Sequence, residues 1–149
     1  MQNGTRGLTL LELVVALATL AVLAGTGVLA FARTIDDVRL NQAARQIVLD
    51  LVGTRTRALA DNTGRRLVFS LDYDRYQPQV QIGGVYSNDG AVVTLPSGID
   101  LTDCTASGSA VTFRPRGNAA TFGTITLRNR PGHVRNVIVD IAGRIRIGP

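Results

Sequence analysis

The sequence lacks lysine and tryptophan, and its 149 residues include one cysteine and one histidine. Because Cys104 has no partner in the chain, an intrachain disulfide is excluded, and an exported domain would depend on packing alone. Cys104 also has no histidine or basic cluster nearby to activate its thiol, so we interpret it as a small buried or loop residue. All sixteen basic residues are arginines. A GC-rich genome explains that bias as well as chemistry does, so it supports no functional inference by itself.

Residues that would support catalysis or metal binding are equally scarce. The lone histidine, His133, lies in a turn-like stretch, where a solvated loop residue is a better interpretation than a general base. Two carboxylate pairs, Asp72/Asp74 and Asp100/Asp103, stand beside turn residues, with no histidine or cysteine to complete a transition-metal site. Acidic loops could hold calcium, but the spacing of an EF-hand is absent, and no glycine-rich phosphate loop joins a strand to a helix. We therefore expect no enzyme activity, no metal, no cofactor and no small-molecule substrate.

Charge is missing from Leu13–Ala32, a run of twenty residues. At about 1.5 Å per residue, a helix of this length measures about 30 Å, the thickness of the hydrocarbon core of a bilayer. Glu12 lies directly before this run, although an acidic residue near the centre of a membrane helix costs on the order of 3 kcal/mol. The run predicts a transmembrane helix, and Glu12 within that helix requires a partner.

An amino group created by processing is a candidate partner for Glu12. Cleavage after Gly7 would make Leu8 the new N-terminus and Glu12 the fifth residue of the mature chain. Residues four apart share a helix face, so the amine and the carboxylate would be close within one chain. Between two packed copies, the amine of one would neutralise the carboxylate of the next. Such an ion pair would set the register of a helical assembly.

Two other interpretations of the uncharged run stay open. It could be the core of a cleaved secretory signal, with Ala30-Phe31-Ala32 as the cleavage site, although it is longer than the usual ~7–15 residues. It could also be an ordinary single-pass anchor, in which Glu12 extends toward the lipid headgroups. Neither alternative uses Glu12 for assembly.

The residues Arg6-Gly7-Leu8-Thr9-Leu10-Leu11-Glu12 form a recognisable motif: a basic leader, a glycine, a hydrophobic residue and T-L-L-E before a long apolar helix. At these residues the chain resembles the type IV pilin and pseudopilin superfamily, which usually has phenylalanine where this chain has Leu8. The resemblance implies that a prepilin peptidase cuts between Gly7 and Leu8 and methylates the new amine of Leu8. It also implies that Glu12 directs assembly and register in a filament.

Beyond the uncharged run, the pattern predicts more helix and then strands. No proline occurs between Arg33 and Asp61, and apolar residues recur at helical spacing, which predicts an amphipathic continuation of the helix. Asp61-Asn62-Thr63-Gly64 predicts its end, with Gly64 as a left-handed cap. After Gly64 the apolar period changes to two, in short runs separated by turn residues. The runs that predict strands are Leu67–Leu71, Arg75–Ile82, Val92–Leu95, Ala110–Phe113, Thr124–Leu127, Val137–Ile141 and Ile145–Ile147. We therefore expect an α+β fold, in which a long N-terminal hydrophobic helix is followed by a mainly antiparallel β head of about seven to eight short strands.

The expected domain organisation follows these changes of pattern. Residues 1–7 form a prepilin leader, 8–32 a transmembrane and filament-core helix, 33–63 its amphipathic continuation, and 64–149 a β-rich head with an arginine-rich C-terminal edge. Within the head, Pro78 predicts that its strand is an edge strand or a bulged one, because proline cannot donate a backbone hydrogen bond.

The C-terminal third contains further motifs: Phe113-Arg114-Pro115-Arg116-Gly117, Gly123–Leu127, Val137–Val139 and Gly143-Arg144-Ile145-Arg146. Together they are similar to the GspH/FimT branch of minor pilins and pseudopilins. Members of this branch sit at a filament tip or start its assembly, in type IV pili or in type II secretion systems. Some FimT-like pilins of naturally competent bacteria bind DNA through a G-R-x-R tail, which Gly143–Arg146 reproduces. The resemblance therefore implies DNA as a candidate partner.

Net positive charge is confined to the final quarter of the chain. Residues 114–149 contain seven arginines and one acidic residue, whereas residues 1–113 contain nine arginines and ten acidic residues. In a strand, Arg144 and Arg146 would share one face at a spacing suited to neighbouring phosphates. The alternative is an ordinary solvated strand face. The candidates for contact with the nucleic-acid backbone are Arg114, Arg116, Arg128, Arg130, Arg135, Arg144 and Arg146.

Three functions are consistent with these features. The main hypothesis is a minor pilin of a type IV pilus, which assembles through its N-terminal helix and contributes to DNA uptake through its arginine-rich C-terminus. The second is a GspH-like pseudopilin of a type II protein secretion system, and the third is a membrane-tethered binding domain that does not polymerise. In the first two, we expect a single-pass protein of the bacterial inner membrane with a periplasmic head. Its partners would be the prepilin peptidase and other pilins or pseudopilins.

Overall fold

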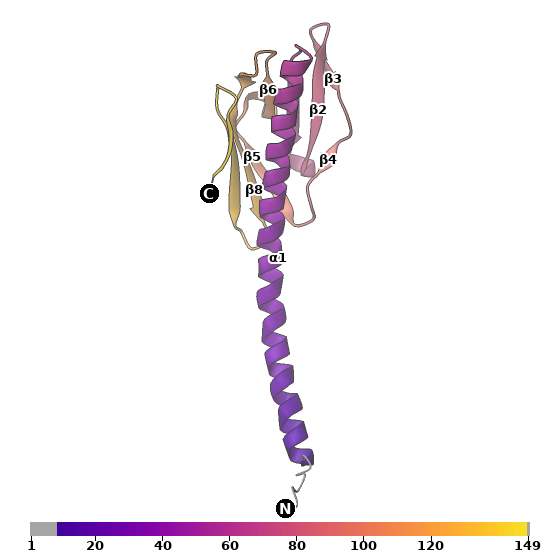
Figure 1. Cartoon of the computed structure of the whole chain (residues 1–149), viewed down its shortest axis with the longest axis vertical. Coiled ribbons are helices and arrows are strands. Elements are labelled where there is room, and N and C mark those ends of the chain that lie inside the picture. Colours follow the sequence, from indigo (N-terminus) through magenta and orange to yellow (C-terminus); the bar gives the residue numbers. More distant parts are fainter. Residues whose placement is uncertain (1–8, 149) are drawn as a thin grey trace, which may run out of the picture. The chain divides into compact units, whose positions relative to one another are not determined.

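The computed structural model describes residues 9–148, excluding the side chains of residues 24–34. One long helix, α1 (Leu10–Ala60), precedes the strands (Figure 1). The chain divides into two compact units, the first up to Ile35 and the second, which we call the head, from Asp36 onward. The predicted leader over residues 1–7 and the cleavage site between Gly7 and Leu8 lie outside the described residues.

The first unit begins with a helix cap. The backbone N–H of Glu12 donates to Oγ1 of Thr9 at 3.3 Å, and the N–H of Leu13 donates to the carbonyl oxygen of Thr9 at 3.1 Å. Thr9 and Glu12 therefore occupy the N-cap and N3 positions of a Thr-x-x-Glu capping box. Glu12 lies in the first turn of α1, where the helix dipole favours an acidic side chain, and this is a local reason for its presence that is separate from any role in assembly.

The transmembrane helix predicted over residues 8–32 is not confirmed. α1 runs without a break from Leu10, and large apolar side chains such as Leu17 and Leu23 are exposed on it. Within the described part of the chain, however, no helix combines the length and the hydropathy needed to cross a membrane.

In the head, α1 packs one face against the strands. Its buried positions follow one another at alternating steps of four and three residues, which keeps them on one side of the helix. These positions are Leu40, Ala44, Ile47, Leu51, Thr54 and Ala58, and Ala43 beside them is buried as well. The apolar ones share a hydrophobic cluster with residues of both sheets, such as Leu67 and Leu127. Full burial of one leucine or isoleucine side chain contributes about 1.5–3 kcal/mol, so this buried stripe is the main attachment of α1 to the head.

α1 ends at Ala60, and its cap is formed by Asn62 rather than by Gly64. Asn62 has a left-handed φ of 50°, and the N–H of Thr63 donates to the carbonyl oxygen of Ala58 at 3.2 Å. This six-to-one hydrogen bond is typical of a Schellman cap, in which asparagine can replace glycine. Gly64 serves close packing instead, because a Cβ there would lie 2.6 Å from Oε1 of Gln81.

Ten strands form two antiparallel sheets in the described residues. The strands are β1 (Arg65–Ser70), β2 (Arg75–Ile82), β3 (Val85–Asn88), β4 (Val93–Thr94), β5 (Ile99–Cys104), β6 (Ala110–Phe113), β7 (Ala119–Thr121), β8 (Gly123–Asn129), β9 (Val134–Val139) and β10 (Ile145–Gly148), with short 3-10 turns η1 (Leu71–Tyr73) and η2 (Ser107–Ser109). The first sheet has the order β3-β2-β1-β6-β7, with β4 also paired to β2, and the second has the order β10-β9-β8-β5. In Figure 1, α1 passes between the gold strands of the second sheet and the pink strands β2 and β3.

The α+β class and the antiparallel pairing are confirmed, but the expected count of about seven to eight strands is wrong. The strands missing from the prediction are β3, β5 and β7. β3 is short and mostly exposed, and β7 consists of small residues. In β5, Ile99 and Leu101 alternate with polar and acidic residues of the kind common in loops. Pairing with neighbouring strands fixes such segments, because their intrinsic strand preference is weak.

Pro78 lies in an internal strand without a bulge, which corrects its predicted position. It is the partner of Leu67 in the continuous register between β1 and β2. On the other side of β2, pairing with β4 stops at Tyr76 and pairing with β3 starts at Gln79, so Pro78 falls in the gap between them. The proline is tolerated there because neither of these strands needs its missing N–H.

Candidate binding surfaces

The seven arginines expected to contact nucleic acid do not form one surface. Arg128, Arg130 and Arg135 lie in or beside the turn that connects β8 to β9. Arg144 lies in the turn that connects the other end of β9 to β10. Because a strand is extended, these two turns are at opposite ends of the second sheet. The expected arginine-rich C-terminal edge is therefore divided into two separate groups.

One group consists of Arg114, Arg116, Arg144 and Arg146, which we call the arginine corner. Arg114 and Arg116 belong to the turn between β6 and β7, and Arg146 is the second residue of β10. All four are exposed. Arg146 lies in β10 opposite Ile138 of β9, whereas Arg144 lies before the strand, so the two do not form the regular strand face that we expected.

Two turns meet at this corner through their backbones. Gly143 packs so closely on the turn between β6 and β7 that a Cβ at residue 143 would lie 2.3 Å from the carbonyl oxygen of Gly117. The N–H of Ala119 also donates to the carbonyl oxygen of Ile141 at 3.1 Å. The contact brings together two motifs that are far apart in the sequence, one containing Arg116 and the other containing Arg144.

Arg55 of α1 stabilises the same contact between the two turns. Its Nε donates to the carbonyl oxygen of Gly117 at 2.8 Å, and this Nε would lie 3.1 Å from a Cβ at residue 143. The sequence predicts only that Arg55 lies on the polar face of an amphipathic helix. No local pattern distinguishes Arg55 from its neighbour Arg57, so its partner could be found only in the folded chain.

The corner combines positive charge with exposed apolar side chains. The Arg144 side chain is 84% exposed, and its Nε lies 4.0 Å from Oδ2 of Asp140, the one acidic residue of the final quarter. Ile141 in the same turn is 64% exposed, and Leu59, which covers Gly117, is 48% exposed. Asp140 offsets one of the four positive charges of the arginine corner, which leaves a net charge of +3.

The second group of arginines is less available to a partner. Arg135 is half-buried, because its Nε donates to Oδ1 of Asn41 on α1 at 3.0 Å. Arg128 and Arg130 are exposed, and Arg130 packs beside Gly98. This end of the second sheet therefore offers two free guanidinium groups rather than three.

Beside that group, Asp37 attaches α1 to the turn between β8 and β9. Its Oδ1 lies 2.6 Å from Nδ1 of His133 and accepts a hydrogen bond at 2.8 Å from Nδ2 of Asn129, which is 1% exposed. Asn129 in turn accepts a hydrogen bond from the N–H of His133 at 2.7 Å. The hydrogen bond from His133 is the main reason why the pKa of Asp37 is lowered, helped by Asn129 and by the charge of Arg135. His133 is therefore part of a structural contact.

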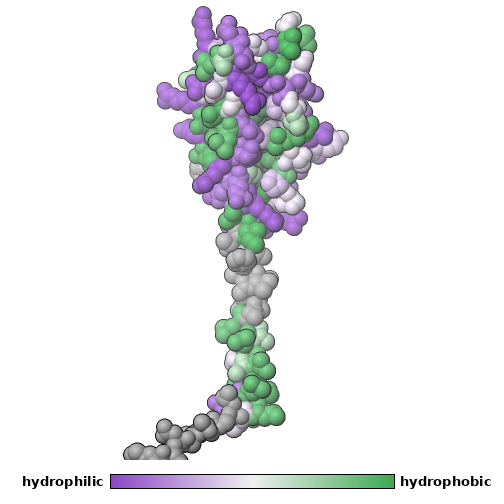
Figure 2. Space-filling model, turned by 45° about the vertical axis from the view of Figure 1, so that its right-hand side comes forward, coloured by the Kyte–Doolittle hydropathy of each residue, from purple (hydrophilic) through white to green (hydrophobic). Residues whose placement is uncertain are grey.

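The outward face of α1 in the head carries a second regular stripe. Val38, Gln42, Arg45, Leu49, Val52, Thr56 and Leu59 follow one another at alternating steps of four and three residues, and all are exposed. We call these residues the outer stripe. Its apolar members are 45–65% exposed. Figure 2 shows one face of the head, where hydrophobic side chains lie between hydrophilic ones. A spacing of 3.5 residues is the one by which a second helix packs along the first.

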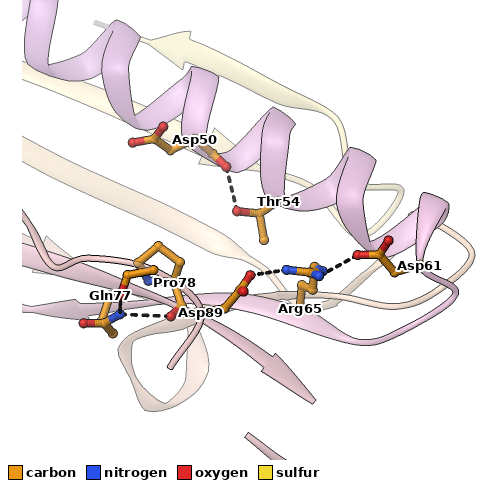
Figure 3. Close-up of polar contacts among 8 residues, drawn as sticks. Asp50, Thr54, Asp61, Arg65, Gln77, Pro78 and Asp89 are labelled. Carbon is orange, nitrogen blue, oxygen red and sulfur yellow. Dashed lines mark hydrogen bonds and ion pairs between the residues drawn. The ribbon is translucent and has the colours of Figure 1, made fainter. Parts of the chain in front are cut away.

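A groove runs beside the outer stripe, between α1 and β2. It encloses about 250 Å³, and its lining includes Leu49, Asp50, Gly53, Pro78 and Val93. A Cβ at Gly53 would meet nothing within 4 Å, so this part of the helix surface is open. In Figure 3, Asp50 and Thr54 on α1 and Pro78 on β2 lie on the two sides of this space.

Two sets of polar contacts lie in or beside the groove. The hydroxyl of Tyr76 donates to Oδ2 of Asp50, and burial, more than this bond, raises the pKa of Tyr76. The guanidinium of Arg65 bridges Asp61, at 2.5 Å, and Asp89 (Figure 3). The Arg65 side chain is only 13% exposed, so its two carboxylate partners compensate a charge that is largely removed from water.

Of the two aspartate pairs noted in the sequence, one member, Asp74, forms a hydrogen bond that connects two parts of the fold. Oδ1 of Asp74 accepts a hydrogen bond from the N–H of Leu101 at 2.7 Å, which ties η1 to β5. Asp100 and Asp103 are exposed on β5. No group of three histidine, cysteine, aspartate or glutamate residues comes together as a metal site in the part of the chain that the structure describes. Cys104 is partly buried, and burial raises the pKa of its thiol.

Two of the three tyrosines lie against arginine side chains, and the third is buried. The guanidinium of Arg66 lies 3.9 Å from the ring centre of Tyr86, and that of Arg75 lies 4.4 Å from the ring centre of Tyr73. Tyr76 is 1% exposed and packs on Phe69.

The chain matches a family of known proteins. The family described as type II transport protein GspH matches residues 43–143. The chain is 28% identical over 145 residues to type II secretion system protein H of Xanthomonas campestris pv. campestris, covering 97% of this chain and 83% of that protein.

Two solved structures share the fold. Both are of the minor pseudopilin EpsH from the type II secretion system of Vibrio cholerae, each with a TM-score of 0.61. The first is 12% identical and covers 74% of this chain and 96% of that one, and the second is 11% identical and covers 76% and 94%. Of the hypotheses from the sequence, these findings favour the GspH-like pseudopilin over the type IV minor pilin. Because the matched residues span both sheets and most of the helix in the head, the chain belongs to the GspH family of type II transport proteins.

Proposed function

We propose that this chain is a subunit of the pseudopilus of a type II secretion system and joins the filament through the outward face of α1. The observation that carries this proposal is the outer stripe. The opposite face of the helix is filled by the head, whereas the apolar side chains of Val38, Leu49 and Val52 on the outer stripe are 45–65% exposed. Their heptad-like spacing suits a helix of a neighbouring subunit.

Processing at the N-terminus belongs to the same proposal. A prepilin peptidase cuts between Gly7 and Leu8 and methylates Leu8, and the uncharged run Leu13–Ala32 holds the subunit in the inner membrane before assembly. The carboxylate of Glu12 is then neutralised by the amine of a neighbouring subunit. The position of Glu12 offers a competing explanation, because a carboxylate in the first turn of a helix is favoured by the helix dipole.

The outer stripe is tested by replacing Leu49 and Val52 with serine together. Removing both apolar contacts costs an interface about 2 kcal/mol, so the amount of subunit recovered with sheared filaments should fall at least about tenfold. Ile82→Ser with Val85→Ser is the matched control, because these residues are equally exposed but lie at the turn between β2 and β3. Wild-type recovery of the Leu49/Val52 variant would refute assembly through this face.

Glu12 is tested with two substitutions that separate charge from capping. Glutamine at position 12 keeps a side-chain hydrogen-bond acceptor at the N3 position but removes the charge, whereas alanine removes both. If the carboxylate pairs with a processed amine, Glu12→Gln and Glu12→Ala should both abolish incorporation into filaments. Normal incorporation of Glu12→Gln would leave capping as the sole role of this residue. Intact-mass analysis of the mature subunit checks the loss of seven residues and the gain of one methyl group.

A second candidate is a minor pilin of a type IV pilus that binds the DNA backbone, and the exposure of Arg144 and Arg146 favours it. Deletion of the gene separates the two machines. Loss of protein secretion with normal DNA uptake supports the pseudopilus, and the opposite result supports the pilus. A wild-type subunit that never enters a filament would instead support a tethered binding domain.

A further inference from the structure

The four arginines of the arginine corner lie outside α1, in two turns and in β10, so the proposed contact through the outer stripe does not use them. Three elements converge on it: the turn between β6 and β7, the turn between β9 and β10, and α1 through Arg55. Gly143 is buried with a φ of 79° and lies against the carbonyl oxygen of Gly117. A side chain at residue 143 would separate the two turns. Because this residue is glycine, the turns that carry the arginines stay in contact and keep a fixed position relative to each other.

The composition of the corner is that of a protein-binding surface. Arg116 and Arg144 project from neighbouring turns, and Leu59 and Ile141 expose apolar side chains among them. Arginine next to exposed apolar residues is typical of the energetically important centre of protein interfaces. Contact with a nucleic-acid backbone uses positive charge alone and gains nothing from an exposed isoleucine.

We propose that the arginine corner binds an acidic protein surface with an apolar centre. Arg116 and Arg144 pair with carboxylates of that partner through planar, bidentate contacts. Ile141 fills the apolar centre between these pairs. The proposal rests on the proposed function, since a subunit of a secretion filament presents its head to other proteins. It is tested on the purified chain without filaments, so that failure of either proposal can be recognised separately.

The test uses three defined probes with the full-length chain in detergent micelles. The first is a short peptide in which aspartate and glutamate alternate with leucine and phenylalanine. The second has the same charges but serine in place of the apolar residues, and the third is a short DNA duplex. We expect the acidic apolar peptide to bind about tenfold more tightly than the serine peptide, and the duplex not to displace it at moderate salt.

Matched variants assign the binding to the corner. Arg116→Gln with Arg144→Gln should weaken both peptides about tenfold, because both use the charges. Ile141→Ser should weaken only the apolar peptide. Arg128→Gln with Arg130→Gln removes the same charge at the other end of the sheet and should change neither affinity. Thermal unfolding of each variant checks that the head is intact.

Three outcomes would overturn the proposal. If the duplex displaces both peptides, and the Arg116/Arg144 variant loses the duplex, the corner is a nucleic-acid site. If the two peptides bind equally, the apolar residues have no part in recognition. If the variants at the two ends of the sheet weaken binding equally, the attraction is general charge rather than this corner.

Discussion

The carboxylate of Asp37 and the imidazole of His133, ninety-six residues apart in the sequence, lie 2.6 Å from each other. Asp37 is the second residue of the head, and His133 belongs to the turn between β8 and β9. Asn129 joins the pair from a buried position. The contact therefore fixes the place where α1 enters the head.

Acid should weaken this contact. The pKa of Asp37 in the folded chain is below its ordinary value of 3.8, chiefly through the hydrogen bond from His133. A lowered folded-state pKa means that the stabilisation is complete above the unfolded pKa and is lost as the pH falls through the folded one. Urea unfolding of wild type and His133→Gln should therefore differ most above pH 3.8, and the difference should vanish in stronger acid. Asp72→Asn, which removes an exposed carboxylate, is the control. A difference that is independent of pH would contradict the role of Asp37.

Replacing Asn129 with alanine should destabilise the head by about 1–3 kcal/mol, because the buried Asn129 side chain makes hydrogen bonds with Asp37 and with the N–H of His133 that alanine cannot make. The control is Asn88→Ala, because Asn88 is exposed and makes one side-chain hydrogen bond, to Gln79. Its effect should stay within about 0.5 kcal/mol. Urea unfolding measures both, and equal effects would show that the buried position of Asn129 has no special importance.

Gly143→Ala should destabilise the head by about 3 kcal/mol or more, because it adds a clash with the carbonyl oxygen of Gly117 to the strain of a left-handed φ. Gly132→Ala separates these causes. Gly132 also has a left-handed φ, of 94°, but a Cβ there would meet nothing within 4 Å, so its cost should be about 1 kcal/mol. Thermal unfolding of both variants checks the difference, and similar midpoints would refute the close contact of the two turns.

Gly53→Ala should stabilise the head by about 1 kcal/mol, because glycine inside a helix costs about that much relative to alanine and the new methyl group meets nothing within 4 Å. Gly64→Ala is the contrasting variant. Its Cβ would lie 2.6 Å from Oε1 of Gln81, so that flexible side chain must move and the variant should gain less stability than Gly53→Ala. A destabilising Gly53→Ala would show that the groove beside α1 is occupied in the native protein.

Periodic elements could be predicted from the sequence because their signal is local. The buried face of α1 and the strands β1, β6, β8 and β9 follow from apolar spacing of 3.6 or 2. The division of the arginines into two groups could also have been foreseen, since successive hairpins of an antiparallel sheet turn at alternate ends. The Thr9-x-x-Glu12 capping box was a readable signal as well.

Other parts of the surfaces depend on contacts between distant residues. Nothing near Arg55 indicates that it reaches Gly117, and nothing near Asp37 indicates His133. The weak strands β3, β5 and β7 exist because their neighbours pair with them. Asn62 rather than Gly64 caps the helix because Gly64 is needed for packing against Gln81. In each case a competing contact overrides the local preference.

Cys104 gives the protein a natural reporter. Its thiol is the single one in the chain, lies partly buried in β5, and has a raised pKa, so little thiolate is present at neutral pH. Reaction with a maleimide should therefore be slow and limited by local opening of that strand. The labelling rate of the unmodified protein would then show whether an occupied surface elsewhere on the head tightens the second sheet.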